Sequence, residues 1–178
     1  MFCRTVIKSN QRKMRNTLAL ILLTLFLISC SSKKDRMPED GEIKINLIAD
    51  KDINPNEKGH PAPLNIFIYN IRDTDVFSNA DFFEIIEGSN KSLASTSSKM
   101  YEAILKPGEM RSIFLSTENK VQALGVIGAY RDLNDAVWLK IYELPPPVSS
   151  WWKRMFSDDA IALNVNFKKS AITIRKMD

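Results

Sequence analysis

The chain has 178 residues, with 25 Lys and Arg, 21 Asp and Glu, one histidine and two cysteines. One histidine and two cysteines are too few for a structural zinc site and leave no disulfide framework. The formal charge of +4 does not indicate nucleic-acid binding, because five basic residues lie in an N-terminal leader and the rest of the chain holds 20 basic and 21 acidic residues with no basic stripe.

The first 29 residues have the pattern of a bacterial secretion signal. A basic region without acidic residues precedes an apolar run at 18–28, and Ser29 is a small residue at the expected cleavage point. About 11 apolar residues are too few to span a bilayer, which takes about 20. Residues 14–29 would form a complete signal alone, so Met14 is an alternative start. A short buried helix and a single membrane anchor are the other interpretations.

Cys30 changes the kind of signal that is predicted. Leu27 at −3, Ser29 at −1 and the cysteine at +1 resemble the bacterial lipobox, in which the thiol receives a diacylglycerol before cleavage. Several acyl chains anchor a protein stably, since each buried methylene contributes about 0.8 kcal/mol. Ser31 is not the aspartate that retains such proteins at the inner membrane. We therefore expect an outer-membrane lipoprotein whose domain faces the periplasm.

The remaining chain divides into a tether and one domain. Residues 30–41 are polar after the lipidated cysteine and contain Pro38 and Gly41, as expected of a linker. Residues 42–178 are long enough to bury the core of a single domain. The other cysteine, Cys3, lies in the leader, so the domain would contain neither a free thiol nor a disulfide.

Short apolar segments separated by turn residues predict an all-β domain. Alternation at 43–47 indicates a half-buried strand, whereas residues 64–71 are apolar on both faces and indicate a central one. Gly125 and Gly128 indicate close packing on a buried strand. Eight strands joined mostly by short turns predict an antiparallel two-sheet β-sandwich. The expected strands are 43–47, 64–71, 100–105, 110–115, 121–130, 136–144, 161–167 and 172–174.

One short helix is predicted within this series. Ser78 is a candidate N-cap with Asp81 three residues later, and Gly88 can end the helix. Phe82, Ile85 and Ile86 would then share one face. Residues 89–98 have the composition of a loop.

The search for catalytic chemistry finds little. The one histidine, His60, lies in a Gly-His-Pro turn, without a nearby serine in a nucleophile context. Residues 50–54 place oxygen ligands at alternating positions, but a calcium loop needs glycine at its sixth position and glutamate at its twelfth, where this chain has Pro55 and Pro61. We expect no enzyme activity, no metal site and no cofactor.

Two segments are candidate interaction surfaces. Residues 50–63 form a long connection whose prolines limit its freedom, which lowers the entropic cost of recognition; a tolerated decorative loop is the alternative. Trp151 and Trp152 are followed by Lys153 and Arg154, a pattern that suits a membrane interface or a protein hot spot. These aromatic residues could instead close one end of the core.

The order of several short motifs resembles the TssJ family of outer-membrane lipoproteins of the type VI secretion system. The resemblance extends from the lipobox to the last strand. The matching stretches are Asn54-Pro55, 59–63 leading into 64–71, Phe77, 79–82, 105–109, 124–132 and Trp138. The segment from 145 to 159 departs from the family by being longer and more aromatic than expected.

The resemblance implies a transthyretin-like sandwich with added helical decoration and a role in the trans-envelope secretion complex. The partner it implies is the periplasmic C-terminal region of a large inner-membrane protein, TssM, which pairs with a smaller one, TssL. The implied contact surface is the loop between the first two strands, here Asp50, Lys51, Asp52, Ile53, Asn54, Pro55, Asn56, Glu57, Lys58, Gly59, His60 and Pro61. Trp151 and Trp152 are a candidate second interface. A secretion pilotin and a glycan-binding lipoprotein remain as alternatives.

Overall fold

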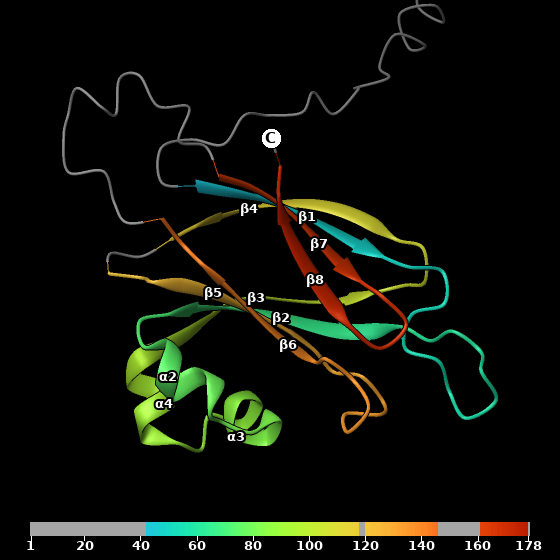
Figure 1. The fold of residues 1–178 in the computed structure, drawn as a ribbon, viewed down its shortest axis with the longest axis horizontal. Coiled ribbons are helices and arrows are strands. Elements are labelled where there is room, and N and C mark those ends of the chain that lie inside the picture. Colours follow the sequence, from blue (N-terminus) through green and yellow to red (C-terminus); the bar gives the residue numbers. More distant parts are fainter. Residues whose placement is uncertain (1–41, 118–119, 146–160, 178) are drawn as a thin grey trace, which may run out of the picture. The chain divides into compact units, whose positions relative to one another are not determined.

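The computed structural model describes residues 42–117, 120–145 and 161–177, and these contain two four-stranded sheets that form a sandwich (Figure 1). The first sheet has the order β4 (Met110–Ser116), β1 (Glu42–Ala49), β7 (Ile161–Phe167), β8 (Ile172–Lys176). The second has the order β3 (Ser97–Leu105), β2 (Leu64–Ile71), β5 (Ala123–Gly128), β6 (Leu139–Glu143).

The predicted sandwich is confirmed, but the prediction that all its strands pair antiparallel is wrong. β1 pairs with β7 in parallel, from Ile43 opposite Ile161 to Ala49 opposite Phe167. The reason lies in the path of the chain. β6 ends beside Ala123, at the end of the sandwich where β1 begins, so β7 enters from that end and runs in the direction of β1.

Two layers of apolar side chains explain why β2 is apolar on both faces. Leu64, Ile66 and Ile68 pack between the sheets with the alternating residues of β1 and β7. Phe67 and Tyr69, on the opposite face, pack beneath a layer of short helices. β2 is therefore central within its sheet and also covered on its outer face, as its sequence predicts.

The outer layer contains three helices where one was predicted: α2 (Thr74–Ser78), α3 (Phe82–Glu87) and α4 (Lys91–Thr96). The predicted N-cap, Ser78, is instead the last residue of α2 and does not cap the N-terminus of a helix. Asp81 caps α3 through a capping box with Glu84, and Gly88 ends it in the left-handed conformation. α4 occupies the segment predicted as a loop; its six residues bury only Leu93, too few to show a periodic pattern.

Several predicted elements lie outside the described residues. They are the leader with Met14, the lipidation site Cys30, the tether, and Trp151 with Trp152. The described helices are all too short to cross a membrane. The β5 and β6 strands are shorter than predicted, and β3 begins three residues earlier, directly after α4.

The topology collects four connections at one end of the sandwich (Figure 1). They are 50–63 between β1 and β2, 106–109 between β3 and β4, 129–138 between β5 and β6, and 168–171 between β7 and β8. Glu42, where β1 begins, lies at the opposite end. We call the end that holds these four connections the loop end.

Candidate functional site

The 50–63 connection joins strands of different sheets. β1 and β2 were expected to be joinable by two to five residues, but they belong to different sheets, and packed sheets lie about 10 Å apart. The loop leaves β1 at the loop end, crosses the edge of the sandwich and enters β2 (Figure 1). The 106–109 connection makes the same change of sheet in four residues, so the change does not account for the length of the 50–63 loop.

The structure divides the predicted contact residues into two groups. Ile53 and Asn54 are buried, with 0% and 4% of their surfaces exposed, and Ile53 packs in the core between the sheets. Their side chains hold the loop and cannot reach a partner. The exposed residues are Lys51, Asp52, Glu57, Lys58, Gly59, His60 and Pro61, with Asp50, Pro55 and Asn56 half-buried.

The tip of the loop has a defined shape because Asn56 closes it. The Asn56 side-chain oxygen accepts hydrogen bonds from the backbone N–H groups of Lys58 (3.0 Å) and His60 (2.9 Å). The Asn56 N–H donates to the His60 carbonyl at 2.9 Å. Gly59 has a φ of +76°, which glycine adopts without strain. The exposed residues 57–60 are thus presented in one turn.

Asn54 joins the loop to two segments that are distant in sequence. Its side-chain oxygen accepts a hydrogen bond from the backbone N–H of Arg131 at 2.9 Å. Its side-chain nitrogen donates to the Pro63 carbonyl at 2.8 Å, and its backbone N–H donates to the Lys169 carbonyl at 3.0 Å. The 50–63 loop, the 129–138 connection and the β7–β8 turn meet at this residue.

Tyr130 makes a second link between the 129–138 connection and the β7–β8 turn. Its ring is buried in the core, and its hydroxyl lies 3.2 Å from the Lys168 carbonyl and 3.0 Å from the Ala171 carbonyl. Burial raises the pKa of the Tyr130 hydroxyl well above its ordinary value, with the negative charge of Asp50 adding to the effect. The hydroxyl therefore stays protonated and can donate throughout the physiological pH range.

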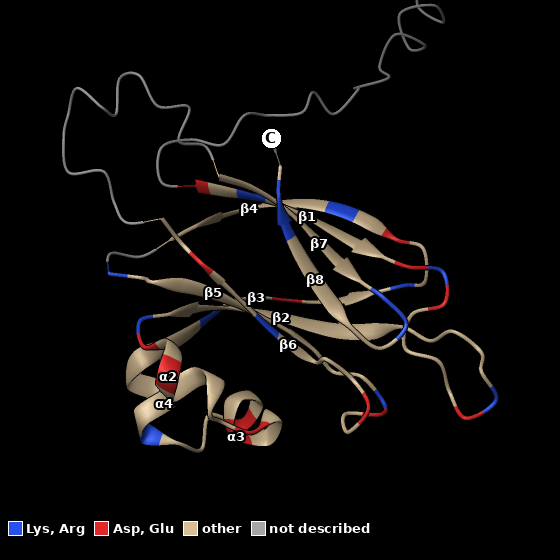
Figure 2. Ribbon diagram, in the orientation of Figure 1, with Lys and Arg blue, Asp and Glu red and all other residues tan. Residues whose placement is uncertain are grey.

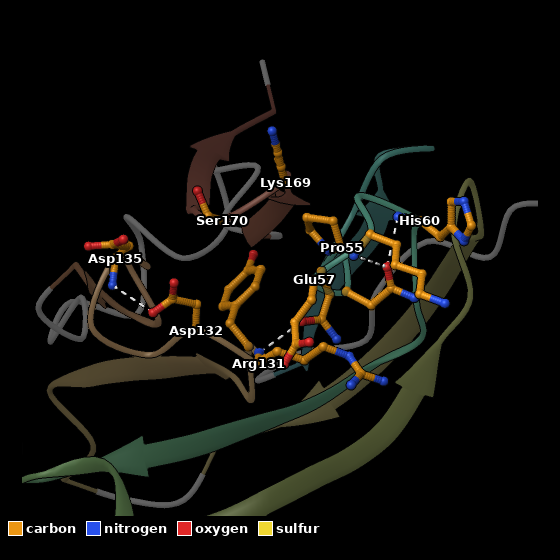
Figure 3. A pocket seen from close by; sticks show the side chains of 12 residues that line it. Pro55, Glu57, His60, Arg131, Asp132, Asp135, Lys169 and Ser170 are labelled. Atoms are coloured by element: carbon orange, nitrogen blue, oxygen red, sulfur yellow. Dashed lines mark hydrogen bonds between the residues drawn. The ribbon is translucent and has the colours of Figure 1, made fainter.

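The three segments enclose an open cleft of about 1150 Å³ at the loop end (Figure 3). Its lining carries both signs of charge, because Lys58, Arg131 and Lys169 lie around it together with Glu57 and two aspartates. Those aspartates, Asp132 and Asp135, come from one bend in which the Asp135 N–H donates to the Asp132 carboxylate at 3.3 Å. The remaining connection at this end, 106–109, also carries a basic and an acidic residue, whereas the charged residues of 168–171 are basic only (Figure 2).

Sequence reasoning named only the 50–61 part of this cleft. Arg131, Asp132, Asp135, Lys169 and Ser170 were missed as site residues. Arg131 and Asp132 do carry a signal, since two charges directly follow the buried β5 strand at its loop-end terminus. The contribution of Lys169 and Ser170 depends on the β1–β7 pairing, which the sequence did not predict.

The chemistry of the cleft is that of recognition. Among residues 42–117, 120–145 and 161–177, no three His, Cys, Asp or Glu side chains lie close enough together to hold a metal ion. His60 is exposed on the outside of the loop turn, and its side chain points away from the cleft centre in Figure 3. The cleft offers charged and amide groups on a fixed backbone, which suits a polar protein surface.

Comparisons with known proteins agree on one family. The family model described as type VI secretion lipoprotein, VasD, EvfM, TssJ matches residues 41–169. The T6SS lipoprotein TssJ1 from Pseudomonas aeruginosa is 25% identical, with a TM-score of 0.67 over 80% of this chain and 98% of that one. No match was found among curated protein sequences.

Two further solved structures share the fold. Serratia marcescens Lip, a membrane-bound component of the type VI secretion system, is 22% identical, with a TM-score of 0.65 over 78% of this chain and 98% of that one. A chain in the solved structure of the C-terminal domain of the T6SS protein TssM from EAEC is 14% identical, with a TM-score of 0.55 over 76% of this chain and 98% of that one. At these sequence identities, the structural similarity establishes the β-sandwich fold alone.

Proposed function

Because the chain belongs to the type VI secretion lipoprotein family, TssJ, whose members are structural components and not enzymes, we propose that it tethers a large inner-membrane protein to the outer membrane. The partner would be a TssM-like protein, bound through its periplasmic C-terminal region. Acyl chains on Cys30 would supply the membrane attachment. The observation that carries the proposal is the fixed, exposed cleft at the loop end, built around the 50–61 loop.

The direction of β1 supports the separation of membrane attachment from partner binding. Its eight residues run from Glu42 at one end of the sandwich to Ala49 at the loop end. At about 3.3 Å per residue, the seven steps from Glu42 to Ala49 separate the two ends by roughly 23 Å. A chain lipidated at Cys30 enters the domain through Glu42, so the cleft would face away from the point of attachment and toward the periplasm.

The loop is suited to a polar contact of high specificity. Its exposed residues are mainly charged, and the one isoleucine that could have served as an apolar anchor is buried. Charged contacts across an interface contribute mostly to specificity and association rate. The hydrogen bonds of Asn54 and Asn56 fix the loop in advance, which reduces the entropy lost on binding.

The glycan-binding alternative gains no support from the residues that line the cleft. A sugar site typically stacks its ligand on an exposed aromatic ring, but the one aromatic ring that lines the cleft belongs to Tyr130, which is 5% exposed. Trp151 and Trp152 remain the candidate second interface.

The proposal is tested by affinity purification of the lipidated protein from detergent-solubilised membranes. We expect the wild type to recover a large inner-membrane protein. The double variant Glu57→Lys, Lys58→Glu exchanges two exposed charges at the loop tip without changing the net charge, and we expect it to recover at most a tenth as much.

A matched control exchanges two charges in the helical layer. Glu87→Lys, Lys91→Glu alters exposed residues of α3 and α4 that do not line the cleft, and should recover as much partner as the wild type. Equal recovery by all three proteins would keep the tethering role but move the contact, with Trp151 and Trp152 the next residues to replace. Failure of the wild type to recover any inner-membrane protein would contradict the proposed function.

A further inference from the structure

We propose that Asn54 is the positioning residue of the partner site: one buried residue whose side chain binds the Arg131–Asp135 segment and the end of the 50–63 loop, and whose backbone N–H binds the β7–β8 turn, so that the three segments form a single surface. The inference rests on the proposed function and deepens it. It predicts that the contact surface is composite and that residues outside the loop contribute to it.

The hydrogen bonds of Asn54 use its side-chain oxygen, its side-chain nitrogen and its backbone N–H. The side-chain oxygen binds the Arg131 N–H, the side-chain nitrogen binds the Pro63 carbonyl, and the backbone N–H binds the Lys169 carbonyl. These three partners belong to three different connections. With 4% of its surface exposed, Asn54 is shielded from the water that would compete for these bonds.

The backbone at Asn54 explains why this residue type is suited to the position. Its φ of +48° lies in the left-handed region, which asparagine enters more readily than other residues except glycine. Glycine would tolerate the backbone but make no side-chain bonds. Aspartate would accept from Arg131 but could not donate to Pro63. Asparagine satisfies both requirements.

The proposed consequence for binding follows from pre-organisation. The charges of Glu57, Lys58 and Arg131 reach a partner as one pattern only if their backbones keep a fixed relation. Asn54 supplies that relation from inside, without touching the partner. Removing its side chain should loosen the loop against the Arg131 segment while the sandwich core, which Asn54 does not hold together, stays folded.

Asn56 provides a matched control, because it is a second asparagine of the same loop whose side-chain bonds stay inside the loop. Its oxygen accepts from Lys58 and His60 only. Asn56→Gly should therefore loosen the loop tip without affecting Arg131. Asn54→Gly removes the same number of atoms, and glycine accepts the left-handed backbone without strain.

The test combines amide hydrogen exchange with partner recovery, using the whole lipidated protein. We expect Asn54→Gly to raise exchange at the Arg131 amide at least tenfold, to leave the core amides of Ile66 and Ile127 unchanged, and to lower recovery of the inner-membrane partner about tenfold. Asn56→Gly should raise exchange at Lys58 and His60 but leave Arg131 at the wild-type rate. Local change at Arg131 with an intact core distinguishes positioning from general destabilisation.

Two results would overturn the inference. One is an unchanged Arg131 exchange rate in Asn54→Gly; the other is a raised rate with wild-type partner recovery, which would make the link real but irrelevant to binding. If Asn54→Gly loosens the whole core, Asn54→Asp decides, because it retains the acceptor for Arg131 and should keep that amide protected. Failure of the wild type to recover a partner removes the proposed function, and the positioning role with it, even where the exchange rates show the link.

Discussion

At the scale of single residues, Tyr130 shows how the loop end is held to the core. Its ring fills the core while its hydroxyl reaches the carbonyls of the β7–β8 turn. Tyr130→Phe keeps the ring and removes the hydrogen bond, so we expect the free energy of unfolding to fall by about 1 kcal/mol. Tyr69→Phe is the control, because the Tyr69 hydroxyl lies 3.4 Å from the Ile85 carbonyl, a longer and weaker contact. Chemical denaturation should show the larger loss for Tyr130→Phe, and equal losses would contradict this account.

The site residues show what a sequence can and cannot specify at this scale. Proline and charge content identified the 50–61 loop as a surface. The burial of Ile53 and Asn54 was not predicted, since a lone apolar residue in a polar segment has no periodic pattern to indicate its direction. Arg131 and Lys169 were missed because they join the cleft only through pairings between strands far apart in the sequence.

At the scale of elements, the helical layer packs closely on the sheet at Gly125, which has no side chain. A methyl group at Gly125 would lie 2.8 Å from the terminal carbon of Ile71 and 2.8 Å from the ring of Phe77. We expect Gly125→Ala to lower the free energy of unfolding by about 1–3 kcal/mol through overpacking. Adding Ile71→Val removes one of the two clashing groups, so the double variant should lose less than the sum of the single changes. Thermal unfolding of the four proteins measures this coupling, and strict additivity would show that Ile71 is not the obstructing group.

The elements also divide by how much of them the sequence could predict. All eight strands were expected, because alternation at β1 and β7 and the double-faced apolar run of β2 are local patterns. Gly88 likewise indicated the end of α3, the only helix expected, but its predicted N-cap, Ser78, was wrong, because Asp81 caps the helix. The parallel β1–β7 pair and the sheet change at 50–63 were not predicted, since both depend on the global path of the chain. α4 was missed because six residues contain too little pattern to distinguish a helix from a loop.

At the scale of the whole molecule, attachment and recognition should be separable, because the described residues supply two extensive apolar clusters of their own. The described domain has two apolar clusters, and both consist of residues from Ile43 onward. We therefore expect Cys30→Ser to leave the thermal unfolding of the domain unchanged while it moves the protein out of the outer-membrane fraction and abolishes secretion. The only other cysteine, Cys3, lies in the predicted leader. The control substitution Cys3→Ser should therefore change none of these properties.

The Cys30→Ser protein also separates the two halves of the tethering role. In detergent solution it should still bind the inner-membrane partner through the loop end, because the loop end is about 23 Å along β1 from Glu42, where the N-terminal segment enters the domain. In cells the same protein should fail, since a partner bound to an unanchored domain is not connected to the outer membrane. Membrane fractionation, partner recovery and a secretion assay on one strain measure all three properties. A Cys30→Ser strain that secretes normally would show that the domain acts without its anchor, and the tethering role would then have to be abandoned.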